Sequence, residues 1–96
     1  MCIAIVGGNE CMVSNYQRLC NQHQYDAKIF TKITGLKKKI GSPDVLILFT
    51  NTVSHKMVRT ALEAIDGKDV PIIRCHSSSL SALKRILETE VSSVLC

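Results

Sequence analysis

VLILF, residues 45–49, is the stretch that decides the fold, because five apolar residues follow one another without a polar break. A run this short and continuous predicts a strand that is buried on both faces, as strands in parallel sheets are. Residues 2–6 (CIAIV) repeat the pattern near the start of the chain and end at a pair of glycines. Two more strands are expected at residues 26–31 and 70–74.

Helical periodicity fills the segments between these strands. One apolar stripe predicts a first helix over residues 11–23, and residues 34–40 predict a short helical turn that carries three lysines. A third helix is expected after Thr52 and ends at Gly67, a residue type that suits a helix C-terminus. A fourth follows residues 77–79, three serines that offer N-cap oxygens. The residues expected to face the sheet are Met12, Tyr16, Leu19, Cys20 and His23 from the first helix and Leu80, Leu83, Ile86 and Leu87 from the fourth.

The predicted order is βα repeated four times, within a single domain that spans residues 1–96. Alternating units of this kind predict an α/β fold of the Rossmann or flavodoxin type, a small parallel four-stranded sheet with helices on both faces. Ligands bind such sheets beyond the carboxyl ends of the strands, near the point where the strand order reverses. Three segments should converge at that edge: Gly7-Gly8, Thr50–His55 and Cys75–Ser79.

Composition narrows the function classes. A net charge of +4 allows an anionic ligand, but lysines 37–39 have no interleaved aromatic residues, so nucleic acid is not an expected partner. No apolar stretch approaches the roughly 20 residues of a membrane span, and the chain does not start with a signal-type segment. Five cysteines, an odd number without a C-x-x-C pair, indicate reduced thiols. We therefore expect a cytoplasmic protein without membrane contact.

Phosphate binding is one hypothesis for the sheet edge. The amides of Gly7 and Gly8 and the hydroxyls of Ser77–Ser79 could hold a phosphate or a carboxylate. The glycines lack the full G-x-G-x-x-G pattern, however, and a plain turn and a single capping serine would explain both segments. A receiver domain is excluded because Thr50 stands where its phosphoacceptor aspartate would be. A phosphotransfer cysteine is disfavoured because Glu10 precedes Cys11.

Two histidines offer a second hypothesis, metal ligation. His55 lies in the first turn of the third helix, off the apolar stripe, where the helix N-terminus favours a neutral imidazole that can bind a metal. His76 directly follows the fourth strand, beside Cys75. Either histidine could instead be an ordinary exposed or capping residue. No Ser-His-Asp order, pair of carboxylates or Cys-His couple stands out, so no enzymatic activity is expected.

Three segments resemble a known bacterial family, catalogued as domain of unknown function number twenty-three twenty-five: IVGG at 5–8, LFTNTVSHKM at 48–57 and HSSSLSAL at 76–83. The resemblance implies a haem-binding module that responds to dioxygen or a related gas. The Val-Ser-His match then makes His55 the first choice of axial ligand. Many relatives carry Arg-Ser-Ser in place of residues 76–78, so His76 would be a variable second ligand or a distal group that hydrogen-bonds a bound gas. Thr50, Asn51 and Thr52 are the candidates for further polar groups.

Haem is too large for so small a domain to enclose, so a site shared between subunits of a homo-oligomer is expected, which suits the apolar tail at 91–96. The predicted function is a non-enzymatic haem-binding module for gas or redox sensing. A nucleotide- or phosphate-binding regulatory domain and a non-catalytic oligomerisation module remain alternatives. The sequence leaves open whether Cys11 or Cys75 contributes a thiolate.

Overall fold

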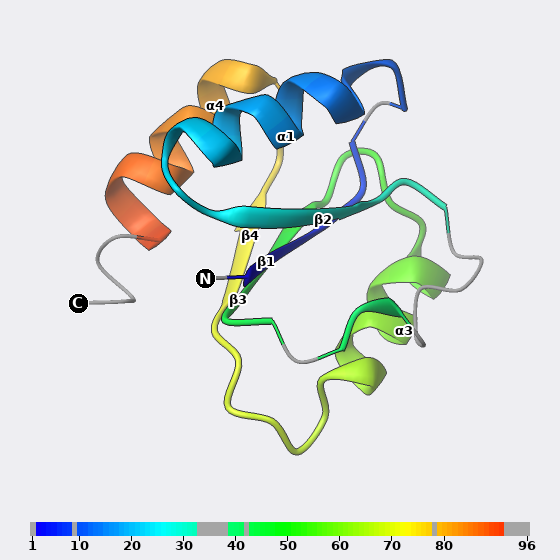
Figure 1. Cartoon of the computed structure of the whole chain (residues 1–96). Coiled ribbons are helices and arrows are strands. Elements are labelled where there is room, and N and C mark those ends of the chain that lie inside the picture. Colours follow the sequence, from blue (N-terminus) through cyan, green and yellow to red (C-terminus); the bar gives the residue numbers. More distant parts are fainter. Residues whose placement is uncertain (1, 9, 33–38, 42, 78, 92–96) are drawn as a thin grey trace.

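A parallel sheet forms the centre of the computed structural model, which describes residues 2–8, 10–32, 39–41, 43–77 and 79–91. Its four strands lie in the order β2-β1-β3-β4, and every neighbouring pair is parallel (Figure 1). The strands are β1 (Cys2–Val6), β2 (Asp26–Phe30), β3 (Val45–Phe49) and β4 (Ile72–Cys75). The predicted α/β fold with a small parallel sheet is therefore confirmed.

The two most apolar runs occupy the middle of the sheet. All five residues of β3 are buried, and β1 pairs with it in a register that sets Ile3 opposite Val45 and Val6 opposite Leu48. A central strand of a parallel sheet has layers above and below it, so each residue needs an apolar side chain whichever face it points to. This explains why the runs at residues 2–6 and 45–49 are continuous rather than alternating.

Helices cover both faces of the sheet (Figure 1). On one face lie α1 (Val13–Gln22), preceded by a 3-10 turn at Glu10–Met12, and α4 (Leu80–Arg85), which continues as a π-helix at Ile86–Val91. On the other face lies α3 (His55–Ala64). Each face of the sheet has its own hydrophobic core, and successive residues of a strand point alternately into one core and the other. The α1 and α4 side takes Ile3, Ile5, Val45, Ile47 and Phe49, and the α3 side takes Ala4, Val6, Leu46 and Leu48.

The expected apolar stripes are confirmed except at His23, which is half-buried at the C-cap of α1 and does not belong to the core. Tyr16, Cys20, Leu83, Ile86 and Leu87 are buried in the core beneath α1 and α4, with Met12, Leu19 and Leu80 packed against it. The turn expected at 34–40 falls mostly outside the described residues, as does the tail at 92–96. Within the described part of the chain, no helix has the length and apolar character needed to cross a membrane.

The fourth strand begins later than its sequence predicts. The expected range was 70–74, whereas β4 starts at Ile72, directly after Pro71. Proline has no N–H to donate, although its carbonyl accepts a hydrogen bond of 3.0 Å from the amide of Leu46. Pro71 thus stands at the start of an edge strand, as expected.

Two adjacent isoleucines of β4 offer a test of this architecture. Ile73 is 8% exposed and belongs to the core beneath α1 and α4, whereas Ile72 points to the other face and is 40% exposed. We expect Ile73→Ala to lower the free energy of unfolding by about 2–4 kcal/mol and Ile72→Ala by about 1 kcal/mol or less. Urea denaturation of both variants measures the difference, and equal losses would contradict the layer assignment.

Candidate functional site

Hydrogen bonds join the three segments at the carboxyl edge of the sheet. The amide of Gly8 donates to Thr52 Oγ1 at 2.7 Å, which links the end of β1 to the loop after β3. The amide of Thr50 donates to the carbonyl of Cys75 at 2.8 Å, which links that loop to the end of β4. The convergence expected from the sequence is therefore present in the fold.

The glycine pair closes the gap between β1 and the loop after β3. Gly7 and Gly8 have φ values of 104° and 90°, in the region that favours glycine. A Cβ on Gly7 would lie 2.5 Å from Cγ1 of Val53, and a Cβ on Gly8 would lie 2.9 Å from the ring of Tyr16. Protein atoms thus fill the crevice beside β1 where the strand order reverses. The two glycines allow the tight turn that closes it.

The serines before α4 are engaged in capping. The hydroxyl of Ser79 accepts a hydrogen bond of 3.2 Å from the amide of Ala82, and the hydroxyl of Ser77 donates to Ser79 Oγ at 3.1 Å. Ser78 lies outside the described residues. The Gly8 amide and the hydroxyls of Ser77 and Ser79 thus have hydrogen-bond partners within the protein.

The Val-Ser-His segment divides into two structural residues and one exposed side chain. Val53 packs against Gly7, and Ser54 is the N-cap of α3, since its hydroxyl accepts from the Met57 amide at 3.2 Å. His55 is the first residue of α3 and is exposed. Its ring has no hydrogen-bond or ion-pair partner among the residues that the structure describes. Among the described residues, His55 therefore has no contact that assigns it a structural role.

Two surface hollows meet at His55 and Val58. One, of about 280 Å³, is lined by Leu48, Thr50, Val53, His55, Val58 and Arg74. The other, of about 430 Å³, is lined by His55, Val58, Arg59, Leu62, Glu63 and Asp66. We call the surface formed by both sets of residues the α3 shelf. It combines four aliphatic side chains with one imidazole, one hydroxyl, two arginines and two carboxylates.

The other two histidines have partners. His76 is exposed, and its Nδ1 lies 3.4 Å from the hydroxyl of Thr50, a residue that lines the shelf, although His76 itself does not. His23 donates from Nδ1 to the carbonyl of Leu19 at 3.0 Å, and its Nε2 lies 3.6 Å from Glu88. The expectation that His23 is a packing residue agrees with these contacts. Thr50 links His76 to the shelf. No hydrogen bond joins the rings of His55 and His76, both of which the structure describes.

Arg74 is a shelf residue that the sequence did not single out. The signal was present, because Ile72 and Arg74 are two residues apart on a strand and so share a face. Recognising this face as open required knowing that β4 is an edge strand. Asn51 and Thr52 were expected near a ligand. Both are exposed, and the Thr52 hydroxyl donates to the carbonyl of Phe49 at 3.1 Å while accepting from Gly8.

The cysteines fall into different environments. Cys2, Cys20 and Cys75 are free thiols, and the Sγ of Cys75 donates to the Ser77 carbonyl at 3.2 Å. Burial raises the pKa of the Cys20 thiol from an ordinary value of 9.0 to about 11. In the described ranges, no cluster of three or more His, Cys, Asp or Glu side chains could hold a metal ion.

Comparison with known proteins identifies a family. The family model described as "Uncharacterized protein conserved in bacteria (DUF2325)" matches residues 2–89. No curated protein and no solved structure matches the chain. The family match confirms the resemblance seen in the sequence and does not extend to a ligand.

Substitution of Gly7 tests whether its turn is structural. We expect Gly7→Ala to lower the free energy of unfolding by about 3 kcal/mol, from backbone strain and overlap with Val53 together. Gly67→Ala is the matched control, since Gly67 also has a positive φ (79°) but no atom within 4 Å of its would-be Cβ. We expect Gly67→Ala to lower the free energy of unfolding by about 1 kcal/mol. Equal costs in denaturant titrations would show that the close approach does not matter.

The raised pKa of Cys20 predicts a loss of stability at high pH. The unfolded thiol ionises near its ordinary pKa of 9.0, whereas the folded thiol holds its proton to about 11. Its contribution is therefore complete below pH 9 and is lost as the pH rises towards 11. Urea midpoints should fall more steeply over this range in the native protein than in Cys20→Ala. Parallel curves would contradict the assignment.

Proposed function

Because the chain belongs to this bacterial family and carries an exposed histidine without a structural task, we propose that it is a haem-binding module with His55 as axial ligand. The observation that carries the proposal is the unpartnered imidazole on the α3 shelf. Val53 and Ser54 in the same motif have packing and capping roles, so only His55 is left to serve a ligand.

The residues of the α3 shelf fit the chemistry of haem. Haem iron needs one or two protein ligands, and imidazole is a common one, so a cluster of three side chains is not required. Val58 and Leu62 provide aliphatic contact for the macrocycle, and Arg59 and Arg74 provide cations for its propionates. When bound, haem supplies an iron centre that can take up dioxygen or a related gas.

Polar groups beside the shelf would be available to a bound haem or gas. The Thr50 hydroxyl lines the shelf and lies 3.4 Å from His76. His76 would be the second ligand or a group that hydrogen-bonds a bound gas, since its Nδ1 lies beside the Thr50 hydroxyl on the shelf. We propose a binding and sensing role without catalytic turnover, in the cytoplasm, where a reducing environment suits the free thiols of Cys2, Cys20 and Cys75.

A second copy of the chain would complete the site. Both hollows open on the surface of α3, so a haem lying there would keep one face in contact with water. Apolar groups favour burial, and a partner subunit over the shelf would provide it. We therefore propose a homo-oligomer with haem at or near the subunit interface. A haem-loaded species that stays monomeric in light scattering would contradict this part of the proposal.

Hemin titration tests the ligand assignment. Purified protein should give a sharp Soret band at stoichiometric hemin, with a further shift when the ferrous form meets carbon monoxide. We expect His55→Ala to abolish or strongly weaken this band, because the iron loses its protein ligand. His23→Gln is the matched control, since His23 is engaged with Leu19 and Glu88 on the other side of the sheet and should leave the spectrum unchanged.

Different results would contradict haem binding and the choice of His55 as its ligand. No spectral change with the native protein would overturn the haem proposal. An unchanged band in His55→Ala together with its loss in His76→Ala would transfer the axial role to His76. Circular dichroism of each variant shows whether the fold is intact, which separates loss of ligation from loss of structure.

A further inference from the structure

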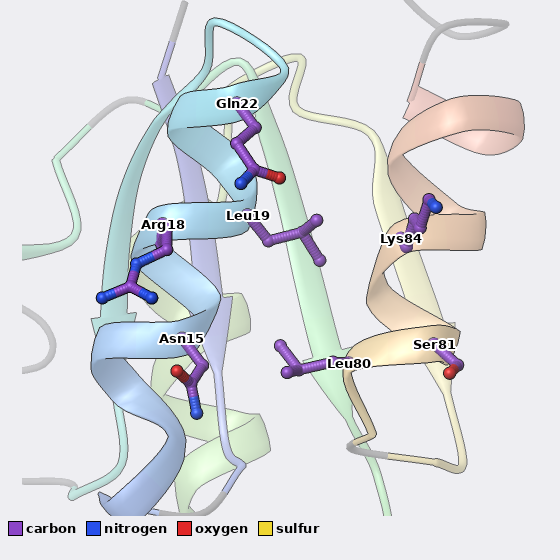
Figure 2. Close-up of a pocket in the computed structure, with 7 residues that line it drawn as sticks. All are labelled: Asn15, Arg18, Leu19, Gln22, Leu80, Ser81 and Lys84. Atoms are coloured by element: carbon purple, nitrogen blue, oxygen red, sulfur yellow. The ribbon is translucent and has the colours of Figure 1, made fainter.

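A groove between α1 and α4 lies on the face of the sheet opposite the α3 shelf. Figure 2 shows the two helices side by side, with Leu19 and Leu80 pointing towards each other between them. The groove has a volume of about 300 Å³. Its walls are completed by polar and cationic side chains: Asn15, Arg18 and Gln22 from α1, and Ser81 and Lys84 from α4.

The charged side chains that line this groove are both positive. Arg18 and Lys84 are exposed and come from different helices, so each wall carries a cation. Neither α1 nor α4 contains an aspartate or glutamate. The π-helix that continues α4 carries Glu88, which lies 3.6 Å from His23 and does not line the groove. The α3 shelf differs, because Glu63 and Asp66 balance its arginines. The α1 and α4 face therefore favours a negatively charged protein partner more strongly than the shelf does, where the arginines are partly balanced by carboxylates.

The apolar floor points to a helix rather than to a nucleic acid. Leu19 and Leu80 are only partly buried, so they offer aliphatic contact to a partner. No lining residue is aromatic, so bases would find no stacking platform. A third helix laid along α1 and α4 would place apolar residues at spacings of three and four over the leucines, and acidic residues beside the walls. Asn15 and Gln22 can donate hydrogen bonds to its carboxylates.

From this combination we propose that the groove between α1 and α4 docks an acidic amphipathic helix of a partner protein. The ten residues of α1 span about 15 Å, enough for roughly three turns of such a helix. The proposal does not depend on haem, because α3, which begins at His55, lies on one face of the sheet and α1 and α4 lie on the other (Figure 1). A module with this arrangement binds its cofactor on one face and its protein partner on the other.

A designed peptide tests the groove. The probe is a helical peptide of about 18 residues, with leucines in an i, i+3, i+7 pattern and glutamates on the flanking positions. Chemical shifts of the isotope-labelled full chain should change in α1 and α4 and not in α3. We expect micromolar affinity by fluorescence anisotropy. The double variant Arg18→Glu, Lys84→Glu should weaken binding about tenfold or more, since both walls then repel the peptide.

A matched double variant separates the groove from total charge. Lys39→Glu, Lys56→Glu changes two exposed cations outside the groove and lowers the net charge by the same amount. It should bind the peptide within about twofold of the native chain. An equal loss in both double variants, equal binding of a scrambled peptide, or shifts centred on α3 would overturn the proposal. So would self-association through the groove, or tighter binding to anionic phospholipid vesicles than to the peptide.

Discussion

The burial of β1 and β3 on both faces is the constraint on which the rest of the structure depends. Every side chain of β3 is buried, and β1 lies beside it with Ile3, Ala4, Ile5 and Val6 fully covered. Such strands cannot face water on either side, so α1 and α4 must cover one face and α3 the other. The parallel arrangement then brings the ends of all four strands, and the loops that follow them, to a common edge.

Close packing at that edge moves the candidate site away from its usual place. In open α/β sheets the crevice between the strands where the order reverses commonly takes the ligand. Here Gly7 brings the end of β1 so near to Val53 that a single added carbon would overlap with it. The accessible surface lies further along the edge, over α3 and beside β4, where Ile72 and Arg74 of the outermost strand are exposed.

The two faces of the sheet differ in chemistry, which is the basis of both proposals. The α3 shelf combines an exposed imidazole, aliphatic side chains, arginines and two carboxylates, and we propose that it holds a metal-containing cofactor. The α1 and α4 groove has cations on each wall and two leucines at its floor, a set that suits an acidic amphipathic helix. The sheet separates the two surfaces, so the two kinds of partner need not compete for the same residues.

The sequence by itself determined the fold and much of the edge. Continuous apolar runs at residues 2–6 and 45–49 predicted strands buried on both faces, and the stripe of Tyr16 and Cys20 predicted a helix face towards the core. These features follow from local periodicity, which the chain carries in its own order. Periodicity also placed His55 off the apolar stripe, where the structure finds it exposed.

Tertiary structure alone decided which groups at the edge are available. The sequence could not show that Thr52 takes the Gly8 amide, that Ser79 caps α4, or that His23 is engaged while His55 is not. It also could not show the hollow that Arg74 and His55 share, or the groove between Leu19 and Leu80. These are contacts between residues far apart in the chain. These contacts depend on the strand order and on packing distances of a few ångströms, and local periodicity predicts neither.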